Sequence, residues 1–507
     1  MKLLKRFSLL TILVVLIPVA AQAQDVPDER FSLQDLSESE GKFGVQFFEG
    51  TTKITKPSVL FAYKANDFSD VIKVCKSISE SGCATAPKLG FDAHMAACSS
   101  KTDMDCIESV YVKVNQETLT TLGEFQAAIP ADHPNFFPAD SKSGLPQGAS
   151  SGIWRIPGIV HEGGTDEYAV VAVQSGFLTR QNGKFKRSDR AMGAFTNPEI
   201  KVAIYPITRL MDPSVAKTSV SVSKENPAER SLSYTFRSGS TSGGCALVDD
   251  GICALRNGFP KNTEFGVKVR LSKSVNGWVH GRIDQPQIEL TKSGETTVLS
   301  ISGLPMNVPV VSGWISPSKF TDAEKEILGP RIIRAGSWHT PDLTGVYAIK
   351  KLEVWNRLLG DRAAAYPSEW SFYSLTEREL QGANSCISNS KNLAGFVSSN
   401  STTYSSGPPE FSTRNQTLDY KIASPHYLKD GSVFEGRYNL SINSKVARCI
   451  YKFSNAPISA SVSVVGGSGE SRVATTAVSE RKGWINLSVN GFTFSSPTVK
   501  VKLKQKK

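Results

Sequence analysis

The chain has 507 residues, of which 40% are hydrophobic and 21% charged. This composition excludes a disordered protein and allows about three domains. The formal net charge of +11 favours contact with anionic cell-envelope polymers or lipid headgroups. A nucleic-acid role is not expected, because the sequence holds no recognisable nucleic-acid-binding motif.

The first 23 residues have the pattern of a signal peptide. Lys2, Lys5 and Arg6 precede an apolar run, and Ala21-Gln22-Ala23 supplies small residues for cleavage. We expect the mature chain to start near Gln24, with a net charge of 11 − 3 = +8. No later apolar run is long enough to span a bilayer. The expected location is secreted or associated with the cell envelope.

Eight cysteines in an exported chain predict disulfide bonds. Three pairs share one spacing and the remaining two cysteines complete a set of four bonds: Cys75–Cys83, Cys98–Cys106, Cys245–Cys253 and Cys386–Cys449. Because Cys-x7-Cys is not a zinc spacing and the histidines are scattered, we expect no metal site and no cofactor.

Regularly spaced short strands with turn residues between them predict a mainly β, multi-domain fold of β-sandwich-like modules stapled by disulfides, with a smaller helical region. The expected organisation is a disulfide-containing region at 24–130, a Pro/Gly/Ser-rich linker or long loop at 131–152, a β-sandwich-like domain at 153–315, a mixed helical region at 316–397, a linker at 398–409 and a C-terminal β region at 410–507.

In chain order, the first expected element is a helix at Val71–Ile78, from apolar residues at helical spacing. Alternation predicts strands over 109–114, 168–173, 201–205, 219–223, 231–236 and 297–301. Capping boxes at Thr321 and Thr376 predict helix starts, and Leu352 and Trp355 belong to an apolar helical stripe.

The C-terminal region is expected to consist of strands. They include Val446–Phe453 and a last strand in which Lys500, Lys502 and Lys504 alternate with apolar residues. Lysines in this pattern are typical of the exposed edge of a sheet.

The clearest local pattern lies between 265 and 290. Val267, Val269 and Leu271 alternate with polar residues before the turn dipeptide Asn276-Gly277. A three-residue loop closed by Gly277 would place Leu271 opposite Gly281 and keep one face of a β-hairpin apolar.

The other face of this hairpin would carry a candidate binding strip of Lys268, Arg270, Trp278, His280 and Arg282. The alternative is that Trp278 packs beneath another strand while the basic groups face water, which is the more common fate of a large aromatic side chain.

His161, Asp166 and Glu167 surround a Gly pair and are the candidates for acid–base chemistry. An ordinary solvated turn explains the same residues, because the second histidine of a zinc motif and the repeated aspartates of a calcium loop are both missing.

The segments 105–109, DCIES, 275–282, VNGWVHGR, and 370–372, WSF, resemble exported actinobacterial proteins of no assigned activity. The resemblance extends over most of the mature chain and implies a secreted or envelope setting. It carries no catalytic residue with it.

These observations favour an exported, non-catalytic protein that binds to the cell envelope or forms part of its surface. The alternative is a secreted hydrolase of a polysaccharide, peptide or lipid, since the carboxylates of glycosidases are placed by the fold and not by sequence spacing. A third possibility is a surface protein that assembles through its basic last strand.

Overall fold

The computed structural model describes residues 39–49, 58–64, 70–114, 119–129, 136–187, 200–211, 216–222, 232–237, 245–249, 252–273, 275–293, 296–329, 336–375, 379–466, 471–473, 475–494 and 497–505. Within these ranges, the backbone alone is described at 211–222, 232–249, 253, 293 and 471–476. The expected signal peptide and the capping box at Thr376 lie outside the described residues.

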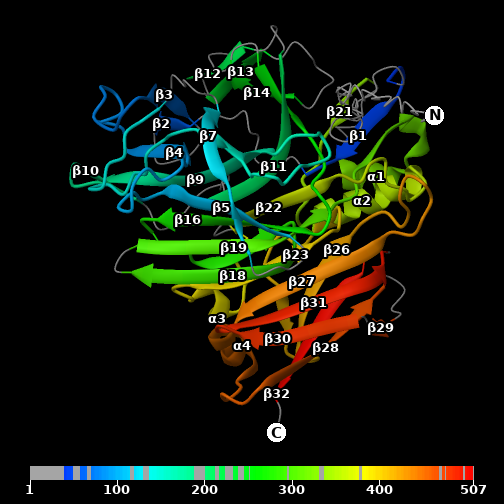
Figure 1. Cartoon of the computed structure of the whole chain (residues 1–507). Coiled ribbons are helices and arrows are strands. Elements are labelled where there is room, and N and C mark those ends of the chain that lie inside the picture. The colour runs from blue at the N-terminus through cyan, green and yellow to red at the C-terminus, as the bar shows by residue number, and fades with distance from the viewer. Residues whose placement is uncertain are drawn as a thin grey trace, which may run out of the picture.

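A long sheet crosses the whole structure (Figure 1). In spatial order its strands are β3 (Val71–Cys75), β2 (Val59–Tyr63), β4 (Lys88–His94), β9 (Glu167–Gln181), β11 (Ile200–Met211), β22 (Ser368–Ser374), β17 (Gly277–Gly281), β23 (Leu393–Ser399), β27 (Glu435–Asn443), β31 (Trp484–Thr493) and β30 (Thr475–Arg481). Shorter strands pair around β9 and β11, namely β7 (Glu124–Ile129), β8 (Ser151–Arg155), β10 (Lys184–Arg187), β14 (Cys245–Asp249) and β15 (Ile252–Arg256). Neighbouring strands run antiparallel except for β17 and β23.

A second sheet covers one face of the middle of the long sheet. Its strands in order are β6 (Thr121–Leu122), β5 (Cys106–Val114), β16 (Thr263–Leu271), β19 (Thr296–Asn307) and β18 (Ile283–Ser293). Val267 and Val269 of β16 pack in one apolar cluster with Val170 of β9 and Val202 of β11. This sandwich is the first core of the protein.

A third sheet covers the opposite face of the long sheet near the C-terminus. It contains β24 (Thr403–Tyr404), β25 (Glu410–Ser412), β26 (Thr417–Ala423), β32 (Thr498–Gln505), β28 (Ile458–Val465) and β29 (Ser471–Val473). Val499 and Val501 of β32 pack against Leu440 of β27 and Leu487 of β31 to form a second core.

Two smaller sheets complete the described strands. The first joins β1 (Phe43–Phe47), β20 (Val311–Ile315) and β21 (Trp338–His339), and the other joins β12 (Ala216–Val222) and β13 (Leu232–Arg237). The described helices are the 3-10 helix η3 (Pro317–Lys319), α1 (Asp322–Leu328), α2 (Val346–Leu358), α3 (Ser385–Ser388) and α4 (Ser444–Tyr451). No described helix is long and apolar enough to cross a membrane.

The mainly β prediction is confirmed, and so are several of its local signals. Val110 and Val112 lie buried on β5, and Thr321 caps α1 in the expected capping box. Leu352 and Trp355 are fully buried on α2, as the helical stripe predicts. The disulfides Cys75–Cys83, Cys98–Cys106 and Cys386–Cys449 are present, and the side chain of Cys253 lies outside the described residues, so the Cys245–Cys253 bond stays a prediction.

Two expected elements have the wrong type. Val71–Ile78 begins with the strand β3 and not a helix, because β3 pairs with β2 at the end of the long sheet. Val446–Phe453 is mostly the helix α4 and not a strand. Asn443 accepts a hydrogen bond from the backbone N–H of Lys445 and so caps this helix.

The predicted hairpin at 265–290 is wrong. Val269 on β16 lies opposite Leu299 of β19, whereas Val279 on β17 lies opposite Ser374 of β22. The chain therefore leaves the second sheet after Leu271 and enters the long sheet at Gly277. Gly277 does have the expected positive φ, +75°, but it serves a crossing between sheets.

Two surface predictions also fail. The last strand, β32, is paired on both sides by β26 and β28, so its lysines do not guard a sheet edge. The stretch expected to be a linker at 398–409 begins inside the protein. Ser399, Asn400, Ser401 and Thr402 are each at most 4% exposed. The sheets also run through the expected domain boundaries, since β5 pairs with β16.

Candidate functional site

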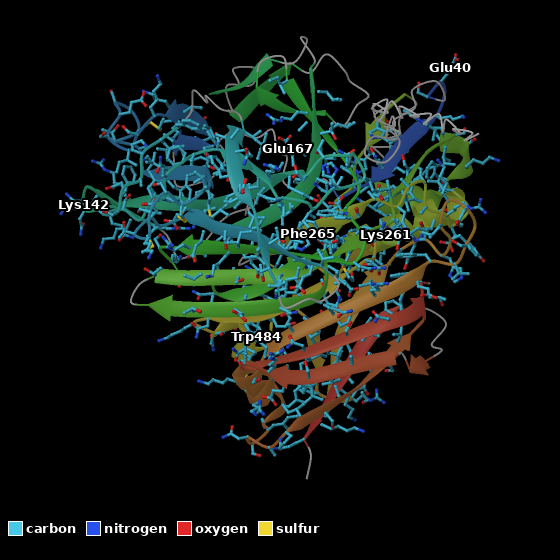
Figure 2. The ribbon with its side chains drawn as sticks, in the orientation of Figure 1. Glu40, Lys142, Glu167, Lys261, Phe265 and Trp484 are labelled. Carbon is cyan, nitrogen blue, oxygen red and sulfur yellow. A yellow bond between two sulfur atoms is a disulfide. The ribbon has the colours of Figure 1, made fainter. Side chains whose placement is uncertain are left out.

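A cavity lies between the edge of the second sheet and the face of the long sheet. Beyond β18, the last strand of the second sheet, the face of β27, β31 and β30 is uncovered (Figure 1). β18 forms the wall and these three strands form the floor of a groove of about 680 Å³. Trp484, labelled in Figure 2, opens β31 and closes one end of the groove with a side chain that is only 6% exposed.

The floor is polar because side chains alternate along each strand. On β31, Ile485, Leu487 and Val489 point into the second core. The alternate residues face the groove, namely Asn486, Ser488 and Asn490.

The neighbouring strands continue these polar rows. Asn486 lies between Ser441 of β27 and Ser479 of β30, and Ser488 lies opposite Asn439 of β27. Carboxamides and hydroxyls both donate and accept hydrogen bonds. This floor can therefore bind a polar ligand without fixing a charge on it.

Hydrogen bonds hold part of the floor in place. The hydroxyl of Ser441 donates to Asn486 Oδ1 at 2.7 Å, and that of Ser488 donates to Asn439 Oδ1 at 2.7 Å. Asn439 Nδ2 donates to the buried Asp284 at 3.1 Å. Because these bonds fix the side chains before a ligand arrives, less conformational entropy is lost on binding.

The wall is bent by a β-bulge. The register between β18 and β19 shifts between Asp284 and Gln287, and Gln285 has a φ of +51°. Bulges often redirect side chains beside binding sites. A positive φ at a non-glycine residue is unfavourable, and contacts with the surrounding structure must compensate for it. Here the bulge leaves Gln285 and Gln287 exposed at the groove.

The rim of the groove is weakly basic. Lys113, Arg481 and Lys482 line it, and the carboxylate among its lining residues is Glu289. Lys482 forms an ion pair with Glu289 across the mouth, and this hydrogen bond lowers the pKa of Glu289.

A smaller cavity of about 230 Å³ continues the groove onto the outer face of the second sheet. It shares Lys113, Gln285 and Gln287 with the main groove. Its carboxylate, Glu264, accepts a hydrogen bond from the hydroxyl of Ser302 at 2.6 Å and pairs with Lys113 at 3.7 Å.

The candidates for acid–base chemistry form a structural turn. His161 is 3% exposed, its Nδ1 accepts from the backbone N–H of Gly163, and burial lowers its pKa. Asp166 pairs with Arg155 at 3.2 Å, and Glu167 binds Arg209. Neither of the two cavities described above includes His161, Asp166 or Glu167.

The expected basic and aromatic strip does not form a surface. Trp278, His280 and Arg282 are each at most 2% exposed, because β17 lies in the middle of the long sheet. Lys268 and Arg270 lie on a different sheet, and both pair with Glu108, at 3.0 and 3.1 Å.

Arg282 has a structural role instead. Its guanidinium binds Glu49 at 2.6 Å and donates to the backbone carbonyls of Ser399 and Ser401. A second buried pair, Arg256 with Glu369 at 2.9 Å, lies in the same region. Burial raises the pKa of Glu369, and Arg256 opposes this rise.

Sequence reasoning missed the groove, although a signal was present. The apolar half of β31 was recognised, but its other half, Asn486, Ser488 and Asn490, was taken only as a polar face. The repeated use of carboxamides and small hydroxyls, without charge, is what distinguishes this face from an ordinary solvated one. Its partners on β27 and β18 are far away in sequence.

Among the described residues, no group of three or more His, Cys, Asp or Glu side chains is placed to hold a metal ion. Comparison of the chain with protein-family models, with curated proteins and with solved structures finds no match.

Proposed function

We propose that the chain is an exported, non-catalytic protein of the cell envelope or extracellular space, and that the groove holds a segment of an envelope polymer. The observation that carries the proposal is the floor of aligned carboxamides and hydroxyls beneath the wall of β18. The volume of the groove lies within the range of ligand sites. The disulfides indicate an oxidising environment, which agrees with export.

The state of the carboxyl groups supports binding over hydrolysis. A glycosidase needs a carboxylic acid whose pKa is raised so that it can donate a proton. Lys482 lowers the pKa of Glu289, and Glu264 is occupied by Ser302 and Lys113. These contacts favour a site that binds without cleaving.

The charge of the rim indicates the kind of polymer. The residues that line the main groove include three positive charges, on Lys113, Arg481 and Lys482, and one negative charge, on Glu289. A weakly anionic chain would be attracted to this rim while its polar groups bind the floor. Such attraction between exposed charges weakens as salt is added.

The test is retention of the purified protein on isolated envelope fractions at low and high salt. We expect retention at low salt that decreases at high salt. An Asn486→Leu variant, which replaces a groove carboxamide by an apolar group of similar size, should lose most of this retention. The matched control is Ser461→Leu on the exposed outer face of β28, which should bind as the wild type does.

Thermal unfolding of both variants would show that each is folded. Equal retention of wild type and Asn486→Leu, or no retention of the wild type at low salt, would overturn the proposal. Release of soluble fragments from the envelope fraction would support the hydrolase instead. Retention on anionic lipid vesicles alone would identify headgroups, and not a polymer, as the partner.

A further inference from the structure

We infer that the groove is the deep end of a longer track for a linear polysaccharide, in which Tyr366 and Tyr427 are platforms for sugar rings. The inference rests on the proposed function and assigns it a chemical class. It starts from the floor strand β27, whose groove-facing residues continue past the cavity.

Alternate residues of β27 share a face, so Asn439, Arg437, Glu435 and then Val433, just before the strand, follow one line. Asn439 to Val433 spans six residues, or about 20 Å at roughly 3.3 Å per residue. Beyond Asn439 the line is open to solvent, since Arg437 and Glu435 are exposed and Val433 is 48% exposed. This length adds room for several rings to the deep groove.

Arg437 connects the deep groove to the first platform. It forms an ion pair with Asp284, the carboxylate that also accepts from Asn439. Its backbone N–H donates to Asn400 Oδ1 at 2.7 Å. Tyr366 lies near this end of β27, because its ring packs against that of Phe434, the residue before Glu435.

Tyr366 has the properties of a fixed platform. Its ring packs edge-on against Phe434, with 5.4 Å between the ring centres, and its side chain remains 36% exposed. Burial raises its pKa to about 12, so the phenol stays neutral.

Tyr427 lies at the end of the line. It pairs with Val433 through an antiparallel β-bridge and is 38% exposed, and its ring packs edge-on against His426 with 4.8 Å between the centres. Each tyrosine therefore contacts one other ring and has exposed surface left for a ligand.

A linear polysaccharide matches both parts of this track. The faces of a pyranose ring carry C–H groups that pack against an aromatic ring, and its edge carries hydroxyls that bond to carboxamides. An extended peptide could use the floor and the free edge of β18, and a proline-rich peptide could pack on the tyrosines. Proline lacks the N–H group that the floor would bind, so one peptide class does not use both parts well. A polysaccharide uses the floor and the tyrosines together.

The test uses soluble oligogalacturonates, which are anionic, and cello-oligosaccharides, which are neutral, of two, four and six rings as probes, measured by titration calorimetry. We expect binding that tightens at least tenfold from two to six rings for one of the two series. The double variant Tyr366→Ala/Tyr427→Ala should lose about tenfold in affinity for six rings and keep its affinity for two rings. The control is Tyr347→Ala, which removes a 76% exposed tyrosine from α2 and should change neither value.

Three outcomes would overturn the inference. Equal affinity for two and six rings would show that no track extends from the groove, and an unchanged double variant would remove the platforms. Either result would leave the groove itself in place. If the wild type binds no oligosaccharide but is still retained on envelope fractions, polysaccharide is rejected as the ligand class and the proposed function stands. If the wild type is not retained on envelope fractions either, both the inference and the proposed function are rejected.

Discussion

His280 provides a measurable link between pH and stability. It is 1% exposed and its ring lies among those of Tyr373, Tyr404 and Tyr420. Its Nε2 lies 3.2 Å from the carbonyl oxygen of Gly407, to which it can donate when the ring is neutral. Nδ1 has no hydrogen-bond partner among the described residues, so a second proton there would be buried without an acceptor from them.

These surroundings lower the pKa of His280 to about 3, mainly by burial and also through the nearby charge of Arg282. An unfolded chain binds the same proton near pH 6.5. Protonation therefore favours the unfolded chain, and the stabilisation is complete above pH 6.5 and lost as the pH falls toward 3. From pH 7 to pH 5 the linkage relation gives a loss of about 2 kcal/mol in the free energy of unfolding.

The perturbation is His280→Gln, which keeps a polar side chain and removes the titration. Urea unfolding at pH 7 and pH 5, followed by tryptophan fluorescence, would give the free energies. The wild type should lose about 2 kcal/mol more than the variant over this interval. Tyr438→Phe is the control, because it removes a buried hydroxyl that has no hydrogen-bond partner among the described residues and leaves His280 and its three neighbouring rings in place. This variant should show the wild-type pH dependence.

Equal losses in the wild type and His280→Gln would refute the reasoning. Such a result would mean that the folded protein accepts the proton near pH 6.5, and hence that His280 is solvated or has an acceptor for Nδ1. Coincident fluorescence and circular dichroism transitions would confirm that one unfolding step is being compared.

Three further predictions concern stability, and each is measured by urea unfolding. Arg282→Met removes the cation that pairs with the half-buried carboxylate of Glu49 and donates to two backbone carbonyls, and it should cost about 3–5 kcal/mol. A loss under 1 kcal/mol would contradict the role of this ion pair. Cys386 and Cys449 are separated by 63 residues, and Cys75 and Cys83 by 8. Replacing both cysteines should therefore cost about 4 kcal/mol for the first disulfide and about 2.5 kcal/mol for the second. A larger loss for Cys75–Cys83 than for Cys386–Cys449 would reject the loop-entropy explanation. Gly395→Ala places a Cβ 2.3 Å from the indole of Trp278 and should cost about 1–3 kcal/mol in the free energy of unfolding. If this clash is the cause, Gly395→Ala should cost less when it is made in a Trp278→Leu background.

Local patterns predicted many elements of the fold, because an alternating run or a capping box is a property of a few neighbouring residues. Val110 and Val112 on β5 and the cap at Thr321 are examples. Local patterns do not predict which strands pair with each other. The alternation of Val267 and Val269 identifies a strand, but it does not say that β19, and not β17, lies beside it.

The wrong assignments of helix and strand have a related cause. At Val446, the spacing of Val446, Ala447, Ile450 and Tyr451 suits a helix, and Asn443 supplies its cap. The β-branched residues and the surrounding strands favoured the other assignment. Local preference is weak here, and packing into the second core decides between helix and strand.

The candidate site was less accessible to prediction than the fold. The residues of the binding strip follow one another in sequence, yet β16 and β17 lie in different sheets, which separates Lys268 from Trp278. The groove brings together β18 and β31, which are far apart in the chain. No pattern within one strand could indicate that the edge of one sheet stands on the polar face of another.

The pairing of distant strands has a consequence for the timing of synthesis and folding. Phe43 of β1 pairs with Ile315 of β20, and Val112 of β5 pairs with Phe265 of β16. These two pairings therefore cannot form until more than half of the chain has been made. A nascent chain with this topology folds slowly and exposes unpaired apolar strands in the meantime, so it needs protection from aggregation until its later strands emerge. Crossing a membrane unfolded and completing the sheets on the far side would provide that delay.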